Sequence, residues 1–458
     1  MESNCVQDGD GEMMGDVELE GPTEPTGKIM KRKNYCYNSR PMNKKQKRNL
    51  WILAWLGVAY FVLLLFPNTF MRGSDNPLVY LHTDEYVVYP SLERMFQFGP
   101  TLNTAWGRII IHGEYHYGYP FFFFSWLTLL PLRLIEGQAF FDNIQRNIFL
   151  LRQLTCVLPM ILTAGVMTFV MTELRKTWQA VFTFLFILTI PAVVGNVTQW
   201  WHPDALMMLA VALTFLFLKL DHQRLGSYFT LAAAACAMAA SIKLMGFFFF
   251  LAIPLYITLA WRKAKFSINK TFWAATRFVL VMVVVIIMTN PFLFYQGPRN
   301  DMLAIQAQKT QELRFGYNHE ESIYYQLGPQ YWRWTIETSY GAPYFPMLLL
   351  VTLIVSAVTQ PEDVNRWVLL AWVVPIGVYL LWFVSPKPDH YLLPLMLPLY
   401  ATVTGVFELL GRIEKAPQNW IRRTAYIAGS LWVIMLVFQF VWQVNTVYAW
   451  YWDYLRVG

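Results

Sequence analysis

The sequence predicts an all-α polytopic membrane protein in which one membrane domain covers nearly everything after residue 49. Its 458 residues are 56% hydrophobic and only 14% charged, whereas soluble domains carry roughly 25% charged residues. Apolar runs such as 51–66 and 278–294 approach the roughly 20 residues that a helix needs to cross a hydrocarbon core. Runs of this kind recur along the chain with short polar connectors between them.

Residues 1–49 differ from the rest and are expected to form a disordered cytoplasmic tail. Residues 1–27 are acidic and residues 28–48 are basic, and both lack the large apolar side chains that offset the entropy of ordering. A basic run beside a first span is typical of the cytoplasmic side of a membrane. Because this location accounts for the basic block, nucleic-acid binding is disfavoured despite a net charge of +7.

Basic connectors predict the orientation of the later spans, because loops rich in Lys and Arg tend to stay in the cytoplasm. Arg175 and Lys176, and the connectors 261–270 and 411–424, are assigned to that side. A full crossing at 121–135 would invert these assignments, so this apolar segment is expected to be short, tilted or juxtamembrane. The layout has about 11 full spans in a bundle of about 11–13 transmembrane helices. The amino terminus is then cytoplasmic and the carboxyl terminus external.

Two connectors on the external side are long, namely 68–119 and 295–342. Connectors of this length are uncommon unless they are functional, and 295–342 is either a candidate lid or an interfacial helix. Under this layout titratable groups gather on the external side. They are Asp84, Glu85, Glu114, His116, His202, Asp204, Lys243, Lys387, His390 and Tyr391.

The segment "HTDE" (82–85) places two adjacent carboxylates just after the first span. Neighbouring residues cannot share one face of a helix or strand, so at most one of Asp84 and Glu85 points into a given site. A partly desolvated carboxylate has a raised pKa and can serve as a general base. The alternative is that the acidic pair only caps the helix that follows.

The segment "HGEYHYGYP" (112–120) combines aromatic, acidic and imidazole side chains, a composition that suits sugar binding. Tyrosine rings can stack on the C–H face of a pyranose, and carboxylates can bind its hydroxyls. A zinc site from His112, Glu114 and His116 is conceivable, but no fourth ligand lies nearby in the sequence. Anchoring of the tyrosines at the membrane interface is the simplest alternative.

Two further segments place polar groups directly before apolar helices. In "WWHPD" (200–204), Pro203 and Asp204 suit a first helical turn, so helix capping alone explains them. In "SPKPDHYLLP" (385–394), a lysine stands beside imidazole and phenol donors, which is what a phosphate at the membrane surface needs. Snorkelling to lipid headgroups is the alternative for Lys387. Lys243, between apolar segments, has to be paired or to reach water.

The order of these segments resembles that of the GT-C polyprenyl-phosphate glycosyltransferases, the group of protein O-mannosyltransferases and lipid A aminoarabinose transferases. The resemblance rests on "HTDE", "HGEYHYGYPFFFFSWL", "LLRQLTCVLPM", "HPDALMMLAVALTFL" and "KPDHYLLPLMLPLY", and it covers roughly residues 50–410. It implies a GT-C-type bundle over residues 50–458. In that fold the loop 68–119 is external and catalytic, and it carries juxtamembrane helices.

The resemblance also implies an activity. A sugar would pass, with inversion, from a polyprenyl-phosphate-linked donor to an acceptor hydroxyl on a glycolipid, a glycan or a protein. Asp84 would take the acceptor's proton, and Glu85 or Glu114 would orient substrate. The leaving lipid phosphate would be stabilised by Lys387, His390 and Tyr391, with help from Lys243. His116, His202 and Asp204 are counted among the substrate-binding residues. Relatives that use monophosphate donors generally need no metal, so no cofactor is expected.

The sequence departs from that group in three ways. Thr83 stands where many relatives carry proline, His116 stands where some carry a lysine, and no soluble domain occupies the late external loop. The endoplasmic reticulum and the bacterial inner membrane both fit. A secondary transporter is the main alternative, but the sequence has no visible internal repeat and no pair of broken spans in matching positions, which transporters often have. A scaffold role would not need acidic and basic groups that converge from distant loops.

Overall fold

A computed structural model describes residues 42–70, 82–316, 323–413 and 419–456 of the chain. Contacts divide the chain into residues 1–42 and 43–458, and the description below concerns the second unit. Its described residues form helices and no strand. The α-helices are α1 (Lys44–Leu63), α2 (Leu65–Phe70), α4 (Thr83–Met95), α5 (Leu102–Ile110), α6 (Tyr119–Glu136), α7 (Ile144–Leu151), α8 (Leu158–Thr172), α9 (Thr177–Leu188), α10 (Pro191–Thr198), α11 (Asp204–Asp221), α12 (Ser227–Lys243), α13 (Ala252–Ala264), α14 (Ile268–Thr289), α15 (Gln296–Phe315), α16 (Arg333–Ser339), α17 (Tyr344–Thr359), α18 (Val364–Phe383), α19 (Leu393–Tyr400), α20 (Gly405–Ile413) and α21 (Asn419–Arg456).

Shorter helical segments connect several of these helices. Arg152–Val157 (η3) is a π-helical segment that joins α7 to α8. The 3-10 helical segments are η2 (Gly137–Asp142), η4 (Met245–Phe250), η5 (Pro291–Phe294), η6 (Ile323–Tyr325), η7 (Pro329–Trp332) and η8 (Asp389–Leu392).

The chain is a multi-pass integral membrane protein. Within the described ranges, 7 helical stretches are long and apolar enough to cross a membrane, and up to 9 if each of two bent pairs is one span. The 7 are Lys44–Asn68, Ile144–Thr172, Met245–Ala264, Ile268–Thr289, Val364–Phe383, Asp389–Gly411 and Arg422–Tyr451. The segment α6 is not among them, in line with the expectation for 121–135. The helix α12 is a shorter apolar helix, so the predicted number of about 11 full spans stays a prediction.

Two expectations from the sequence are corrected by the helices. Residues 44–49 are not part of a disordered tail, because α1 already begins at Lys44. The Asn43 side chain accepts a hydrogen bond from the Gln46 backbone at 2.9 Å and the Gln46 side chain accepts one from the Asn43 backbone at 3.0 Å, which is a capping box. The Lys, Arg and Gln residues that follow are good helix formers. The remainder of the predicted tail, residues 1–41, lies outside the described residues.

The second correction concerns broken spans, which the sequence did not reveal. The helices α9 and α10 meet at an angle of 57°, and the segment Pro329–Ser339 meets α17 at 102°. Pro191 occupies the first turn of α10, where its missing N–H ends the hydrogen-bonding pattern of α9. Bent helix pairs are therefore present among the described residues, and the argument against a transporter rests on the lack of a visible internal repeat.

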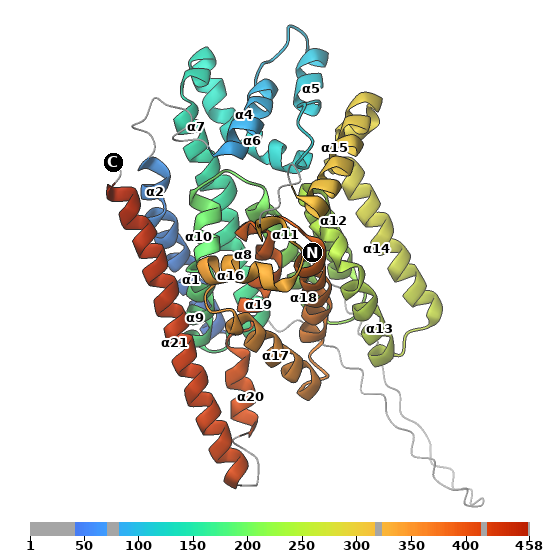
Figure 1. Cartoon of the computed structure of the whole chain (residues 1–458). Helices are drawn as coiled ribbons and strands as arrows, with labels where there is room; N and C mark the ends of the chain where they lie inside the picture. Colours follow the sequence, from blue (N-terminus) through green and yellow to red (C-terminus); the bar gives the residue numbers. More distant parts are fainter. Residues whose placement is uncertain (1–41, 71–81, 317–322, 414–418, 457–458) are drawn as a thin grey trace, which may run out of the picture. The chain divides into compact units, whose positions relative to one another are not determined.

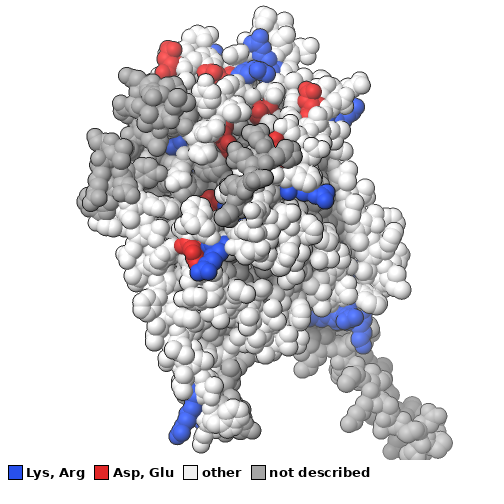
Figure 2. Space-filling view, in the orientation of Figure 1, with Lys and Arg blue, Asp and Glu red and all other residues white. Residues whose placement is uncertain are grey.

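The predicted external loop 68–119 contains helices, as the GT-C resemblance implied. Within its described part, α4 and α5 lie at the upper end of Figure 1, together with α15, whereas α13 and α14 meet lower down, at the right of the view. Residues 71–81 and 317–322 of the two long connectors lie outside the described residues. In Figure 2 the visible Asp and Glu side chains gather mainly at the same upper end, and the broad middle is mostly uncharged.

The helices α11 and α12 form the centre of the bundle and position two polar groups. They pack side by side, and α11 also packs against α8. The buried face of α12 is made largely of alanines, which lets the helix backbones approach closely. Because the two helices are joined by a short connection, the first residue of α11, Asp204, lies beside the last residue of α12, Lys243.

Candidate active site

The predicted site residues converge around one polar cavity of about 600 Å³ at the end where α4 and α15 lie. Asp84, His116, His202, Lys243, His390 and Tyr391 line it, and they come from five separate parts of the chain. Glu85, Glu114, Asp204 and Lys387 do not line it. Tyr117, Trp200, Lys309 and Glu312 are further lining residues that the sequence analysis did not single out.

The two adjacent carboxylates point in different directions. Asp84, in the first turn of α4, lines the cavity, and the positive end of the helix dipole favours its charge. Glu85 is fully buried and forms a two-pronged ion pair with Arg152, at 2.8 Å and 2.5 Å. It also accepts hydrogen bonds from the backbone N–H groups of His82 and Trp201. Glu85 therefore caps α4 and fastens it to η3, which holds Asp84 in place.

The loop between α5 and α6 presents a phenol to Asp84. The hydroxyl of Tyr117 lies 3.4 Å from Asp84 Oδ2 and 2.9 Å from His202 Nε2. A phenol has one proton, so Tyr117 can donate to only one of these acceptors at a time. Burial lowers the pKa of His202, although Asp204 acts in the opposite direction. The neutral imidazole can therefore accept the Tyr117 proton at Nε2.

Gly118 allows this loop to approach the end of α12. Its N–H donates to the Ile242 carbonyl at 3.0 Å, and a Cβ at Gly118 would overlap the carbonyl group of Ser241. The neighbouring Glu114 carboxylate is hydrogen-bonded to the backbone N–H and to the ring of His116. Burial raises the pKa of Glu114, but hydrogen bonds from His116 outweigh this effect and hold the pKa below its ordinary value.

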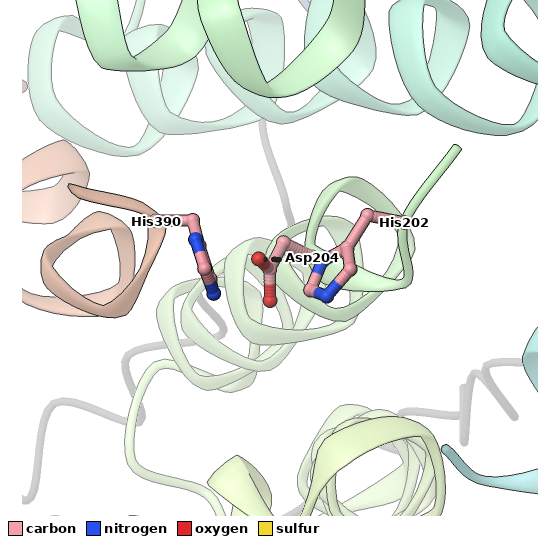
Figure 3. Close-up of side chains that lie close together, drawn as sticks. All are labelled: His202, Asp204 and His390. Atoms are coloured by element: carbon pink, nitrogen blue, oxygen red, sulfur yellow. Dashed lines mark ion pairs between the residues drawn. The ribbon is translucent and has the colours of Figure 1, made fainter. Parts of the chain in front are cut away.

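Asp204 lies behind the cavity wall and binds two of the residues that line it. Its Oδ1 is 2.6 Å from Lys243 Nζ and its Oδ2 is 2.8 Å from His202 Nδ1. Asp204 is at the amino end of α11 and Lys243 at the carboxyl end of α12, so each charge meets the helix end that favours it. Figure 3 shows the Asp204 carboxylate between the His202 and His390 rings.

Stacked rings form one wall of the cavity. Trp200 stacks on His202 with ring centroids 4.2 Å apart, and the His390 ring meets the edge of Trp200 at 4.6 Å. His82 contacts the same indole at 4.4 Å. The ring of Tyr391 lies next to His390 and 5.4 Å below Lys243 Nζ. Aromatic rings with polar edges suit the C–H groups and hydroxyls of a sugar.

Lys387 does not reach the cavity. Its ammonium group hydrogen-bonds the backbone carbonyls of Val384 and Ser385 and lies 5.1 Å from the Trp332 ring centroid. Burial lowers the pKa of Lys387 to about 8. The side chain is nearly inaccessible and secures the loop before η8. Its predicted part in lipid-phosphate binding has no support from this placement.

Lys309 of α15 brings a second ammonium group to the cavity. Its Nζ donates to the His116 carbonyl at 3.3 Å and lies 5.1 Å from the Tyr117 ring centroid. A second contact, from Gln306 Nε2 to the Tyr115 carbonyl at 3.2 Å, also attaches α15 to this loop. Burial lowers the pKa of Lys309 to about 8. The sequence signal was only that α15 belongs to the long connector 295–342.

A second, mainly apolar cavity of about 320 Å³ adjoins the first one. Phenylalanine and leucine side chains of η4, η5, α15 and α18 contribute to its lining. Five residues line both cavities. These are His116, Tyr117, Lys243, Lys309 and Tyr391. The two lysines therefore stand at the boundary between a polar and an apolar space.

The metal site considered at residues 112–116 does not form. His112 is buried against the rings of Tyr115 and Phe122, and burial lowers its pKa to about 4. Within the described part of the chain, the group with the residue types and spacing of metal ligands is instead His202, Asp204 and His390.

No family model and no curated protein matches the chain, whereas solved structures do. One is ArnT from Cupriavidus metallidurans bound to undecaprenyl phosphate, with a TM-score of 0.50, 16% identity, and coverage of 86% of this chain and 72% of ArnT. ArnT is an aminoarabinose transferase of the GT-C superfamily. This protein has the GT-C fold.

A second similar structure is the oligosaccharyltransferase AglB from Archaeoglobus fulgidus, in complex with an inhibitory peptide and a dolichol-phosphate. The TM-score is 0.48 and the identity 12%, over 86% of this chain and 56% of AglB. The GT-C fold predicted from the order of five short sequence segments is thus confirmed by ArnT. At this identity the likeness establishes the fold, and the activity has to be argued from the cavity.

Proposed function

We propose that this protein is a glycosyltransferase that moves a sugar, with inversion, from a polyprenyl-phosphate-linked donor to an acceptor hydroxyl. The observation that carries the proposal is the cavity in which the Asp84 carboxylate and the Lys243 and Lys309 ammonium groups lie together. Its volume of about 600 Å³ is within the roughly 300–1,000 Å³ of small-molecule sites. The GT-C fold shared with ArnT, whose structure holds undecaprenyl phosphate, supports the same class of donor.

The two adjoining cavities suit a donor with a polar head and an apolar chain. The sugar phosphate would occupy the larger, polar cavity, and the first isoprene units would occupy the apolar one. The phosphate then falls at the boundary, beside Lys243, Lys309 and Tyr391. This placement gives Lys309 the role that the sequence analysis had assigned to Lys387.

Asp84 is the general base of the proposed reaction. It takes the proton of the acceptor hydroxyl while the acceptor oxygen bonds to the anomeric carbon of the sugar. The bond between that carbon and the phosphate oxygen breaks, and its electron pair leaves with the lipid phosphate. Once protonated, Asp84 can donate to the Tyr117 oxygen while Tyr117 donates to His202 Nε2. These hydrogen bonds stabilise the protonated base.

The leaving phosphate gains negative charge in the transition state, and fixed cations in a poorly hydrated site stabilise that charge. Lys243 is held by Asp204 and Lys309 by the His116 carbonyl, so neither ammonium has to reorganise during the reaction. His390 and Tyr391 would supply hydrogen bonds. Glu85 does not touch substrate in this proposal. It acts as a positioning residue for Asp84.

The orientation proposed from the sequence has the amino terminus in the cytoplasm and the cavity on the external or lumenal side. Residues of α4 and α15, which lie at the upper end of Figure 1, line the cavity, and the basic connection between α13 and α14 lies in the lower half of the view. The helix α15 lies over the loop at residues 115–117 through its contacts with Tyr115 and His116. It is the part of the proposed lid that would close the cavity.

Lipid binding tests the donor class without knowledge of the sugar. We expect dolichyl phosphate or undecaprenyl phosphate to raise the thermal unfolding midpoint of the detergent-purified protein, since a ligand at about 100 times its Kd stabilises by about 2.7 kcal/mol. Dolichol, which lacks the phosphate, should have little effect. Lys309→Gln should weaken phosphate-lipid binding about 10–100-fold, because a hydrogen bond to a charged group contributes about 1.5–3 kcal/mol.

The matched control is Lys263→Gln, which removes an exposed lysine at the end of α13, away from the cavity. It should bind the lipids as the wild type does. Equal stabilisation by dolichol and dolichyl phosphate would contradict the proposed phosphate-binding site. The absence of stabilisation by either phosphate would favour the transporter.

The Lys309 ammonium predicts a pH dependence of this binding. Burial lowers the Lys309 pKa to about 8, so its cationic form prevails below that pH and is lost above it. From about pH 7, where a phosphate monoester is already largely dianionic, to about pH 9.5, the affinity for dolichyl phosphate should therefore fall.

Lys309→Arg is the control for the pH dependence, since arginine keeps its charge throughout this range. Its binding curve should be nearly flat from neutral to alkaline pH in isothermal titration. A decline as steep as that of the wild type would assign the titration to another group, with Lys387 the first candidate because its pKa is also about 8.

A further inference from the structure

Three buried residues behind the cavity have the composition of a metal site. The ligand atoms of His202, Asp204 and His390 all lie within 4.8 Å of one another, and the side chains converge in Figure 3. Two imidazoles and one carboxylate are a common ligand set for zinc, manganese and iron. Divalent ions would therefore be expected here if nothing else occupied the coordination space around Asp204.

Lys243 occupies that space. Its Nζ lies 2.6 Å from Asp204 Oδ1, and His202 Nδ1 faces the other carboxylate oxygen at 2.8 Å. The side chains of Lys243 and Asp204 are only 11% and 1% exposed. The helix ends reinforce the pair, because Asp204 begins α11 and Lys243 ends α12. The carboxylate is thus already neutralised by a cation that belongs to the chain.

We propose that Lys243 is a built-in counter-ion that takes the place of a divalent metal on Asp204. A metal at His202, Asp204 and His390 would have to displace the ammonium group, and a buried charge that loses its partner is strongly destabilising. Lys243 also lines both cavities and lies 5.4 Å from the Tyr391 ring centroid. The same ammonium group can therefore face Asp204 on one side and a lipid phosphate on the other.

The role of Lys243 in the reaction rests on the proposed function, whereas the predicted effect on metal binding rests on the geometry alone. In the proposed reaction the leaving group is a monophosphate, and the Lys243 ammonium would supply the positive charge that a metal would otherwise supply. The prediction for the protein itself is independent of any sugar or lipid. Removal of the Lys243 ammonium should open a divalent-metal site on the three remaining side chains.

Cobalt binding to the purified full chain tests the proposal, because Co²⁺ bound by imidazole and carboxylate ligands absorbs visible light. Lys243→Ala should bind one Co²⁺ per chain, roughly a hundredfold or more tighter than the wild type. The spectrum should disappear in the double variant Lys243→Ala/His390→Ala. Lys243→Arg keeps the positive charge and should resemble the wild type.

The outcomes are decisive in both directions. Stoichiometric Co²⁺ binding by the wild type that is lost in His202→Ala would overturn the proposal. So would a folded Lys243→Ala protein with no gain in affinity. If the alanine variant does not fold, Lys243→Gln replaces it, because its amide can still donate to Asp204 but carries no charge. It too should bind Co²⁺ more tightly than the wild type. Lipid-phosphate binding is measured separately, so its failure would count against the proposed function and leave the cobalt result intact.

Discussion

Asp84→Asn should lower the rate of sugar transfer by about 10²–10⁴-fold, the usual contribution of a general base. The amide has nearly the same shape as the carboxylate, but it cannot take the proton of the acceptor hydroxyl. Binding of polyprenyl phosphate should change by less than about threefold, since Lys243 and Lys309 would hold the phosphate. The measurement is the release of free polyprenyl phosphate from polyprenyl-phosphate-linked sugars.

Glu312→Gln is the matched control for Asp84→Asn. Glu312 also lines the cavity, from α15, and its carboxylate accepts a hydrogen bond from Gln308 at 2.8 Å. The variant loses the same charge from the same cavity, and it should keep most of the activity. If Glu312→Gln abolished transfer while Asp84→Asn kept it, the base would have been assigned to the wrong carboxylate.

Glu85→Ala should destabilise the protein by about 3–5 kcal/mol, the cost of breaking a buried ion pair and leaving one charge without its partner. Glu85 and Arg152 are 0% and 2% exposed, so the Arg152 guanidinium could not recover its solvation in water. The hydrogen bonds from His82 and Trp201 would be lost as well. The expected result is a large fall in the thermal unfolding midpoint.

Glu136→Ala is the comparison for this effect. It breaks the pair with Arg146, in which both side chains are 24% exposed, so the loss should be about 1 kcal/mol or less. The double variant Glu85→Ala/Arg152→Met should be more stable than Glu85→Ala alone, because it removes the stranded charge. Equal midpoints for Glu85→Ala and Glu136→Ala would contradict a structural role for the buried pair.

The sequence predicted where the site forms because helix ends carry the charge in a membrane protein. Asp84, His202, Lys243 and His390 each lie at or next to the end of a helix that the layout assigned to the external side. Because successive connectors alternate between the two sides of the membrane, every second connector brings its residues to the same side, whatever their distance along the chain. The expected convergence came from the apolar runs and from the charge of the connectors between them.

The sequence could not predict the direction of individual side chains. Two adjacent carboxylates cannot share a face, but only the partner Arg152, 67 positions away, determines that Glu85 turns inward. The residues next to Lys387 in the sequence are typical of a phosphate site. Its ammonium group nevertheless donates hydrogen bonds to the carbonyls of its own loop. Lys309 was missed because nothing local distinguishes it from the other charged residues of α15.

The breaks in the helices were missed for a related reason. Pro191 ends an apolar pattern that otherwise continues, and apolar periodicity does not reveal the angle at which the next helix leaves. The start of α1 at Lys44 was missed because composition outweighed the capping box of Asn43 and Gln46. Both features are local hydrogen-bonding effects, and a window of hydropathy averages over them.

A structure determined with bound dolichyl phosphate would test the central claim most directly. The account predicts that the phosphate lies within hydrogen-bond distance of Lys243 and Lys309, with Asp84 across the polar cavity. The first isoprene units should follow the apolar cavity lined by residues of η4, η5 and α15. A phosphate held by Lys387, or a lipid bound away from both cavities, would contradict it.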